Sequence, residues 1–548
     1  MILPPDKTRA RDESRSESTT GARPRTAGFV LALGAAGALL LGGCTLGPDP
    51  HRPTTVVDSA DTFVHDPGDV GAPERGAEDA GAKDLADDGA SGQQLGAEVG
   101  PWWRSFGDAA TVSLVEEALG ANTDIQAAAA RVLELQTRVK SARGARWPEL
   151  SASGGLSRTR NSFTLPEIGR VAVYATTFSA SLDVSYQLDL FGRLKRAEQA
   201  AWSDLLAEEA ARKTVVHSVI AEVVRARTQL STLGRAESIA RETRDSWSKT
   251  FETIERRYTA GLTSALDMRL ARENLASADA ELVLAGQRLE QARLGLDVLL
   301  GRRPGTGDVP SEWLDPLPPL ESVPVGLPAS LLDRRPDLRQ REMQLAAATS
   351  RIGVALANLY PNLSLTGSAG SNSDTFSDLL SSDTLVYNAI SSLIAPIFTA
   401  GPRRADVDAA RARADQAAAA YAGSILQALR EVEDALVRDN AARDRLTHLE
   451  TRVKEARAAK DIAEERYRRG VLPLLQVLET DRRLRGAETA LTSAQGETWS
   501  TRVDLFLALG GDWTDDGESS GQPSPQPGVA EAAGATSLPQ PTSTEEDA

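Results

Sequence analysis

The chain has 548 residues and a formal net charge of −16, with 41% hydrophobic but only 5% aromatic residues. So few large side chains exclude a thick globular core, and so much hydrophobic content excludes a wholly disordered chain, so the composition favours long, thin helices. The acidity lies in two flanks: residues 49–99 hold twelve acidic and three basic residues, and 511–548 hold eight acidic and no basic residues. The balanced middle offers no basic stripe, which argues against nucleic acid as a partner.

The N-terminus predicts export. An apolar run from Ala27 to Leu41 follows two arginines and is too short to span a membrane comfortably, which is typical of a signal peptide over residues 1–43. Cys44 is the single cysteine and directly follows Leu-Gly-Gly. This arrangement resembles the bacterial lipoprotein box, in which the cysteine is lipidated, and Thr45 after it favours sorting to the outer membrane. A plain signal peptide with an incidental cysteine is the alternative.

Residues 44–100 are rich in Asp, Gly, Ala and Pro without apolar periodicity, and we interpret them as a lipidated, disordered tether. Order is predicted from residue 101, where Trp102 and Trp103 stand. From there to Arg146, apolar residues recur at spacings of three and four, which predicts helix. Pro148 ends it.

The apolar period then changes from about 3.6 to 2, which predicts two strands, at about 149–159 and 171–190. One face of these strands is apolar with tyrosines toward its ends, and the other is almost wholly polar. That pattern is expected of strands between lipid and a wet lumen. A soluble hairpin with one buried face is the alternative. Two further strands are predicted at about 362–371 and 384–397, the last alternating less cleanly.

Long proline-free stretches follow each strand pair and predict coiled coils at 193–301 and 402–510, each about 95 Å long before its turn. The return helices carry a strict heptad repeat, and the small residues in it allow close approach of neighbouring helices. In the first copy, the a and d positions are Met268, Ala271, Leu275, Ala278, Leu282, Ala285, Leu289, Ala292, Leu296 and Leu299. In the second, they are Val477, Thr480, Leu484, Ala487, Leu491, Ala494, Thr498, Thr501, Leu505 and Ala508.

The chain is a two-fold repeat. Arg257, Tyr258 and Gly261 reappear as Arg466, Tyr467 and Gly470, and in both copies the glycine stops one helix before the next begins. We therefore predict a first repeat at 101–301, a connector at 302–329, a second repeat at 330–510 and a disordered acidic tail at 511–548.

Four motifs carry a family resemblance: Gly-Leu-Pro-x-x-Leu-Leu-x-Arg-Arg-Pro-Asp-Leu from Gly326, Leu-Asp-Leu-Phe-Gly-Arg at 188–193, Pro-Ile-Phe-x-x-Gly at 396–401 and Glu-Val-Glu-Asp-Ala-Leu at 431–436. Over about residues 100–510 the chain resembles the outer-membrane efflux proteins of the TolC and OprM kind, specifically the lipoprotein members that serve tripartite pumps. Physics agrees, because four strands cannot close a barrel and open edges in lipid would cost several kcal/mol per unpaired backbone group, as a rough estimate.

The resemblance implies a mainly α fold with a membrane β-barrel: a homotrimer shares one 12-stranded barrel in outer-membrane lipid, continued by an α-helical coiled-coil tunnel into the periplasm. It implies an exit channel for drugs or other small molecules, with a periplasmic adaptor and an inner-membrane RND-type pump as partners. The residues themselves indicate no enzyme, cofactor or metal site, since the four histidines stand at no metal-ligand spacing and no Gly-rich phosphate loop follows a strand. A periplasmic adaptor or a structural coiled-coil lipoprotein is the alternative.

The turns lie farthest from the strands, so residues 257–266 and 466–475 are predicted at the periplasmic tip. By resemblance, this tip docks the adaptor through Arg257, Tyr258, Gly261, Leu262, Arg466, Gly470 and Val471. The resemblance also implies an aperture gate of Leu475, Glu479, Asp267 and Tyr467: a hydrophobic ring, an acidic ring, and an aspartate bonded to a tyrosine of a neighbouring coil. The alternative is that these are ordinary packed or solvated coil residues.

Overall fold

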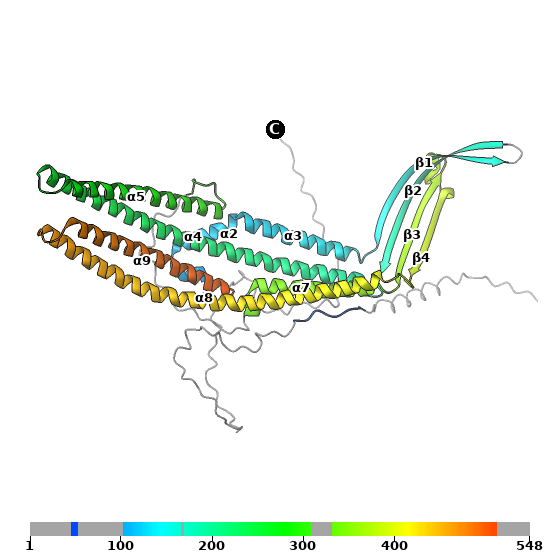
Figure 1. The fold of residues 1–548 in the computed structure, drawn as a ribbon. Helices are drawn as coiled ribbons and strands as arrows, with labels where there is room; N and C mark the ends of the chain where they lie inside the picture. The colour runs from blue at the N-terminus through cyan, green and yellow to red at the C-terminus, as the bar shows by residue number, and fades with distance from the viewer. Residues whose placement is uncertain (1–44, 53–101, 166–168, 308–330, 512–548) are drawn as a thin grey trace, which may run out of the picture.

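The protein is elongated, with paired helices at one end and a four-stranded sheet at the other (Figure 1). This computed structural model describes residues 45–52, 102–165, 169–307 and 331–511. The predicted signal peptide, Cys44, most of the tether and connector, and nearly all of the acidic tail lie outside the described residues.

The ordered N-terminal helices are η3 (Trp102–Phe106), α2 (Ala109–Ala121) and α3 (Thr123–Gly144). The sequence predicted helix throughout this stretch, but the structure interrupts it at Asn122. The side-chain oxygen of Asn122 accepts from the backbone N–H of Asp124 and Ile125, which caps α3, while its Nδ2 donates to the carbonyl of Leu299 at 2.8 Å. A capping residue tied to a distant helix thus sets the break.

The strands are β1 (Glu149–Leu165), β2 (Gly169–Leu188), β3 (Asn362–Ser373) and β4 (Leu385–Ile394). They form one antiparallel sheet in the order β1-β2-β3-β4, so β1 and β4 are its two edges. The hairpin of β1 and β2 extends beyond β3 and β4 (Figure 1).

Two strand ends differ from the prediction by three residues or more, and the others agree within two residues. β1 continues to Leu165 rather than ending near 159, because its polar outer half pairs with β2 as far as Gly169, and polar residues gave no alternating signal. β4 stops at Ile394, three residues before the predicted 397, because Pro396 lacks the N–H that a strand ladder needs. Between β3 and β4 lie two short 3₁₀ turns, η5 (Ser377–Leu380) and η6 (Ser382–Thr384).

From the pair Glu149–Ser185 to the pair Leu156–Phe178, and across to β3, the register gives the sheet one apolar and one polar face. Directly paired residues share a face, and the apolar face holds the pairs Leu150–Val184, Ala152–Leu182 and Leu156–Phe178 of β1 and β2, continued across the sheet by Leu365 opposite Tyr186 and Leu363 opposite Leu393. The other face carries a hydrogen-bonded network in which Ser181 Oγ lies 2.8 Å from Ser153 Oγ and 2.8 Å from the Asp183 carboxylate. Such a sheet fits lipid on one side and water on the other.

Each repeat sends out a 67-residue helix and returns by a 35-residue one: α4 (Arg193–Thr259) with α5 (Ala265–Leu299), and α8 (Pro402–Arg468) with α9 (Leu474–Ala508). At 1.5 Å per residue the long helices span about 100 Å. Between the repeats lie α6 (Leu331–Arg334) and α7 (Pro336–Ala357). Of the described helices, none combines the length and apolarity that crossing a membrane would require.

The predicted heptad positions form the seams of the hairpins. Ala271, Ala278 and Ala285 are buried on α5, and Leu484, Ala487 and Ala494 are buried on α9. The largest hydrophobic cluster lies where η3, α2, α4, α5 and α9 meet, around Trp102, Phe106, Val115, Ile220, Leu296 and Trp499. This cluster fixes the two hairpins to each other near the middle of the molecule.

Candidate functional site at the helical turns

The two turns that end the long helices have the same backbone geometry. Gly261 N donates to Tyr258 O at 2.9 Å and Leu262 N to Arg257 O at 2.8 Å. The second turn has the same pair of bonds, made by Gly470 and Val471 (2.9 and 3.0 Å). Gly261 and Gly470 have φ of 72° and 73°, the left-handed conformation that glycine adopts without a Cβ penalty. The predicted glycine turns are therefore a pair of Schellman caps.

The helices that leave the turns begin differently. At α5, Ser264 and Asp267 form a capping box: Asp267 N donates to Ser264 Oγ at 3.1 Å, and Ser264 N donates to the Asp267 carboxylate at 3.2 Å. Hydrogen bonds from the hydroxyls of Ser264 and Thr263 lower the pKa of Asp267. At α9 the equivalent position is Pro473, which has no side-chain cap bond. Within one chain, Asp267 thus caps the N-terminus of its own helix, α5.

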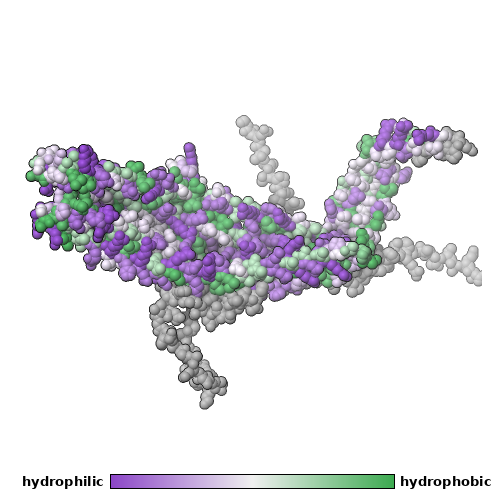
Figure 2. Space-filling model, viewed as in Figure 1, coloured by the Kyte–Doolittle hydropathy of each residue, from purple (hydrophilic) through white to green (hydrophobic). Residues whose placement is uncertain are grey.

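Apolar side chains at both turns are exposed. Leu262 and Val471 are 68% and 72% exposed, and Leu266 and Leu475 are each 66% exposed. Tyr258 is partly exposed beside them. Figure 2 shows apolar surface at this end of the molecule among hydrophilic residues. Leu475 is therefore not one of the packed coil residues of its own chain, which are instead its neighbours Leu474 and Leu478.

Tyr467 joins the two hairpins. Its ring lies against a hydrophobic cluster, around Trp247 and Ile254 of α4, to which α5 and α9 also contribute. The guanidinium carbon of Arg257 lies 5.6 Å from the ring centroid of Tyr467, a cation–π distance. Arg257 and Tyr467 were expected at the tip, but their contact with each other was not predicted. It links the end of α4 to the end of α8.

Glu479 is paired within its own helix. Its carboxylate accepts hydrogen bonds from Arg482 at 3.0 Å and from Arg483 at 2.7 Å. These bonds lower the pKa of Glu479 to about 2, and the bonding to Arg482 has the larger effect. The spacing of three and four residues could have revealed this pairing from the sequence. The two arginines offset the negative charge on which an acidic ring would depend.

The packing of residues 45–52 was not predicted from the sequence, which placed them at the start of a disordered tether. In the structure they lie against α4 and α7. Arg196, 2% exposed, donates to the carbonyls of Leu46 (3.0 Å) and Gly47 (2.9 Å) and pairs with Asp49 at 2.9 Å. A Cβ on Gly47 would lie 2.5 Å from Gly353 Cα, so the chain can pass only because both residues are glycines.

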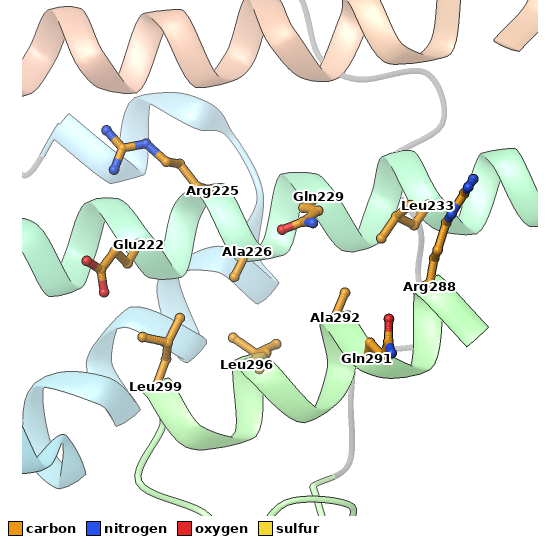
Figure 3. Close-up of a pocket in the computed structure, with 11 residues that line it drawn as sticks. Glu222, Arg225, Ala226, Gln229, Leu233, Arg288, Gln291, Ala292, Leu296 and Leu299 are labelled. Atoms are coloured by element: carbon orange, nitrogen blue, oxygen red, sulfur yellow. The ribbon is translucent and has the colours of Figure 1, made fainter. Parts of the chain in front are cut away.

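A groove of about 540 Å³ runs between α4 and α5 near the middle of the molecule. In Figure 3, Ala226, Ala292, Leu296 and Leu299 project into the space between the two helices, with Glu222 and Gln229 along the same side of α4. Its lining is mainly apolar. In a single chain this surface is open to solvent.

The turns, the paired long hairpins and the two-faced sheet together match a known family. The family model described as outer membrane efflux protein matches residues 114–302 and 327–511, one range for each repeat. The chain belongs to this family.

Individual relatives agree. The chain is 34% identical over 409 residues to the solvent efflux pump outer membrane protein SrpC of Pseudomonas putida, covering 75% of this chain and 87% of that protein. It is 32% identical over 485 residues to the outer membrane protein OprJ of Pseudomonas aeruginosa, covering 88% and 95%. Its fold matches the outer-membrane channel OprN with a TM-score of 0.72 at 30% identity, covering 85% of this chain and 99% of that one. The open-state MtrE channel of Neisseria gonorrhoeae gives 0.71 at 27%, covering 87% and 100%.

This efflux protein is thus an outer-membrane channel component of an efflux pump, and it extends from that membrane into the periplasm. The family and the fold decide against the alternative of an adaptor or a structural coiled coil. The family is not enzymatic. Among the described residues, no group of three or more His, Cys, Asp or Glu could hold a metal ion.

Proposed function

We propose that three copies of this chain form one 12-stranded barrel and one helical tunnel, through which an RND-type pump exports small organic molecules. The observation that carries the proposal is the sheet itself. β1 and β4 each leave an edge unpaired, and in lipid every unpaired backbone group costs several kcal/mol, as a rough estimate. Pairing β4 of one copy with β1 of the next removes both edges. The open apolar groove between α4 and α5 is a surface that a second copy would cover.

Cysteine crosslinking tests the trimer. Across the sheet, Ser151 on β1 is level with Asn388 on β4, three strand spacings or about 14 Å away, and Ser392 lies four residues further along β4. Both distances are beyond the reach of a disulfide within one chain. We expect cysteines at Ser151 and at Ser392 or Asn388 to give a covalent ladder that stops at three chains. Cysteines at the directly paired Ser153 and Ser181 are the control and should crosslink within a monomer. Ladders that stop at two chains, or continue past three, would contradict the proposal.

The turns are proposed to dock a periplasmic adaptor. Leu262 and Val471 are exposed apolar residues at the points farthest from the membrane, flanked by Arg257, Tyr258 and Arg466, and Gly261 and Gly470 shape the turns that present them. A photocrosslinker at Leu262 or Val471 should capture the adaptor. One at Val283, which is 74% exposed but lies about 27 Å along α5 from its first residue, is the control. Capture of outer-membrane proteins alone at the turns would contradict this docking.

The aperture is proposed at Leu475 and Glu479, with Asp267 and Tyr467 holding it closed. The exposure of Leu475 supports a role outside the packed seam of its own chain. The pairing of Glu479 with Arg482 and Arg483 means that three copies would attract cations less strongly than three unpaired carboxylates.

Lipidation of Cys44 is proposed from the Leu-Gly-Gly-Cys motif, and the positions of Thr45 and Leu46 indicate where the lipid would lie. The backbone N–H of Leu46 donates to the carbonyl of Phe191 at 3.4 Å, three residues beyond the end of β2, and Gly192 leaves room for Thr45. A lipid on Cys44 would then enter the inner leaflet close to the barrel.

The cargo is proposed to be apolar or amphipathic small molecules, because the relatives are described as solvent, toluene and antibiotic efflux components. Expression with its own adaptor and pump in a strain lacking such channels should restore growth in toluene and in antibiotic. Restoration of neither, by a protein that reaches the outer membrane, would contradict the proposal.

A further inference from the structure

Two arginines stand on the lipid-facing side of the sheet, just beyond its apolar band. The register pairs Arg158 with Thr176 and Arg160 with Tyr174, immediately after the pair Leu156–Phe178. Directly paired residues share a face, and up to the pair Leu156–Phe178 this face carries the apolar residues of the hairpin, among them Leu150, Leu182 and Val184. Arg158 and Arg160 therefore point outward from the barrel rather than into its lumen.

The length of the apolar band places them at the outer membrane surface. From Leu188 to Phe178 the strand covers about 33 Å, or about 25 Å once tilted, which matches the apolar band of outer-membrane barrels. Arg158 and Arg160 follow Leu156 by two and four residues, about 7 and 13 Å further along the strand. The headgroup layer beyond the band is roughly 5–8 Å deep, so the two long side chains reach it.

The surroundings of Arg158 and Arg160 leave both guanidinium groups exposed, as anion binding requires. Both are exposed, and within the described parts of the chain neither forms an ion pair with a carboxylate; Arg160 instead stacks over Tyr174, with its guanidinium carbon 5.6 Å from the ring centroid. At the opposite end of the strands, Arg146 pairs with Glu198, and Arg193 donates to Gln187 at 2.6 Å. Figure 2 shows hydrophilic surface at the outer end of the hairpin.

We propose that Arg158 and Arg160 bind the phosphate groups of outer-leaflet lipid, the phosphorylated glycolipid that faces the outside in outer membranes. A planar guanidinium binds phosphate through two parallel hydrogen bonds, and stacking on Tyr174 holds one of them in place. This contact would tie the long hairpin, which extends past β3 and β4, to the membrane surface.

The test uses the purified full-length protein in detergent micelles with EDTA, titrated with diphosphoryl lipid A and followed by native mass spectrometry. Arg158→Gln with Arg160→Gln should weaken binding about tenfold or more, since charge-assisted hydrogen bonds are lost. Arg170→Gln is the matched control, because Arg170 lies on the same face of the same hairpin opposite Thr164, about 26 Å beyond Leu156 along the strand. We expect it to change the affinity less than about twofold, as is usual for a surface substitution without contacts.

A face exchange makes the test independent of net charge. Arg158→Thr with Thr159→Arg, combined with Arg160→Asn and Asn161→Arg, keeps the composition but turns both guanidinium groups to the lumen. It should bind as weakly as the double glutamine variant. Wild-type binding by this variant, or an equal loss in Arg170→Gln, would overturn the proposal.

Two measurements on the wild-type protein complete the test. Raising NaCl from low to high concentration should weaken lipid A binding several-fold, because exposed charges are screened; an unchanged affinity would overturn the proposal even where a variant fails to fold. Inorganic phosphate at millimolar concentration should not displace lipid A. Displacement would mean a site for free anions rather than for lipid.

Discussion

The contact between Arg257 and Tyr467 predicts how the proposed aperture is held closed. Tyr467→Leu removes the ring on which the guanidinium rests, whereas Tyr467→Phe keeps the ring and removes only the hydroxyl. If the contact seen within one chain holds the tip, the leucine variant should open the channel more often and the phenylalanine variant should not. If a hydroxyl bond to Asp267 of a neighbouring copy holds it, both variants should open.

The magnitude follows from the exposure of Arg257. A cation–π contact at an exposed site contributes about 0.5–1 kcal/mol. In the proposed trimer, three such contacts would break together and contribute about 1.5–3 kcal/mol. That corresponds to a rise of roughly 10- to 150-fold in the ratio of open to closed channels, at about 1.4 kcal/mol per tenfold change.

Single-channel recording in planar bilayers measures this ratio directly. Arg257→Gln should open the channel about as much as Tyr467→Leu, since each removes one partner. The control is Arg466→Gln, which changes the equivalent arginine of the second repeat and should leave the open probability near the wild-type value. Equal opening by Tyr467→Phe and Tyr467→Leu, or none by Arg257→Gln, would refute the reasoning.

Three further outcomes are expected. Cys44→Ser should leave an unprocessed or unanchored precursor in membrane fractionation, and normal retention of a cleaved protein would contradict lipidation. Leu475→Ala with Glu479→Ala should raise single-channel conductance and lower cation preference without dissolving the trimer. In the wild-type protein, the pKa of Glu479 is lowered to about 2, so its charge and its ion pairs should persist from pH 7 to about pH 4 and be lost only as the pH falls toward 2. Asp439→Asn should destabilise the fold by about 3–5 kcal/mol, because it removes the carboxylate that lies 3.1 Å from the buried guanidinium of Arg502. The temperature at which heat-modifiable gel migration changes should therefore fall, and an unchanged temperature would contradict this prediction.

The sequence by itself determined the elements whose causes are local. The heptads on α5 and α9 predict their own buried seams, because a seven-residue repeat places its members on one side of a helix. Gly261 and Gly470 predict the turns, because a helix that ends in the left-handed conformation favours glycine. The pairing of Glu479 could also have been predicted, since its arginines lie three and four residues away.

Tertiary structure decided what depends on residues far apart in the chain. The break at Asn122 needs the carbonyl of Leu299, the outer half of β1 needs β2 to pair with, and the packing of residues 45–52 needs Arg196 about 150 residues later. Tyr467 finds Arg257 only because four helices converge at the tip. A periodic pattern reports which side of an element is buried, but it does not identify the distant residue that covers that side, because that choice is made by packing between elements.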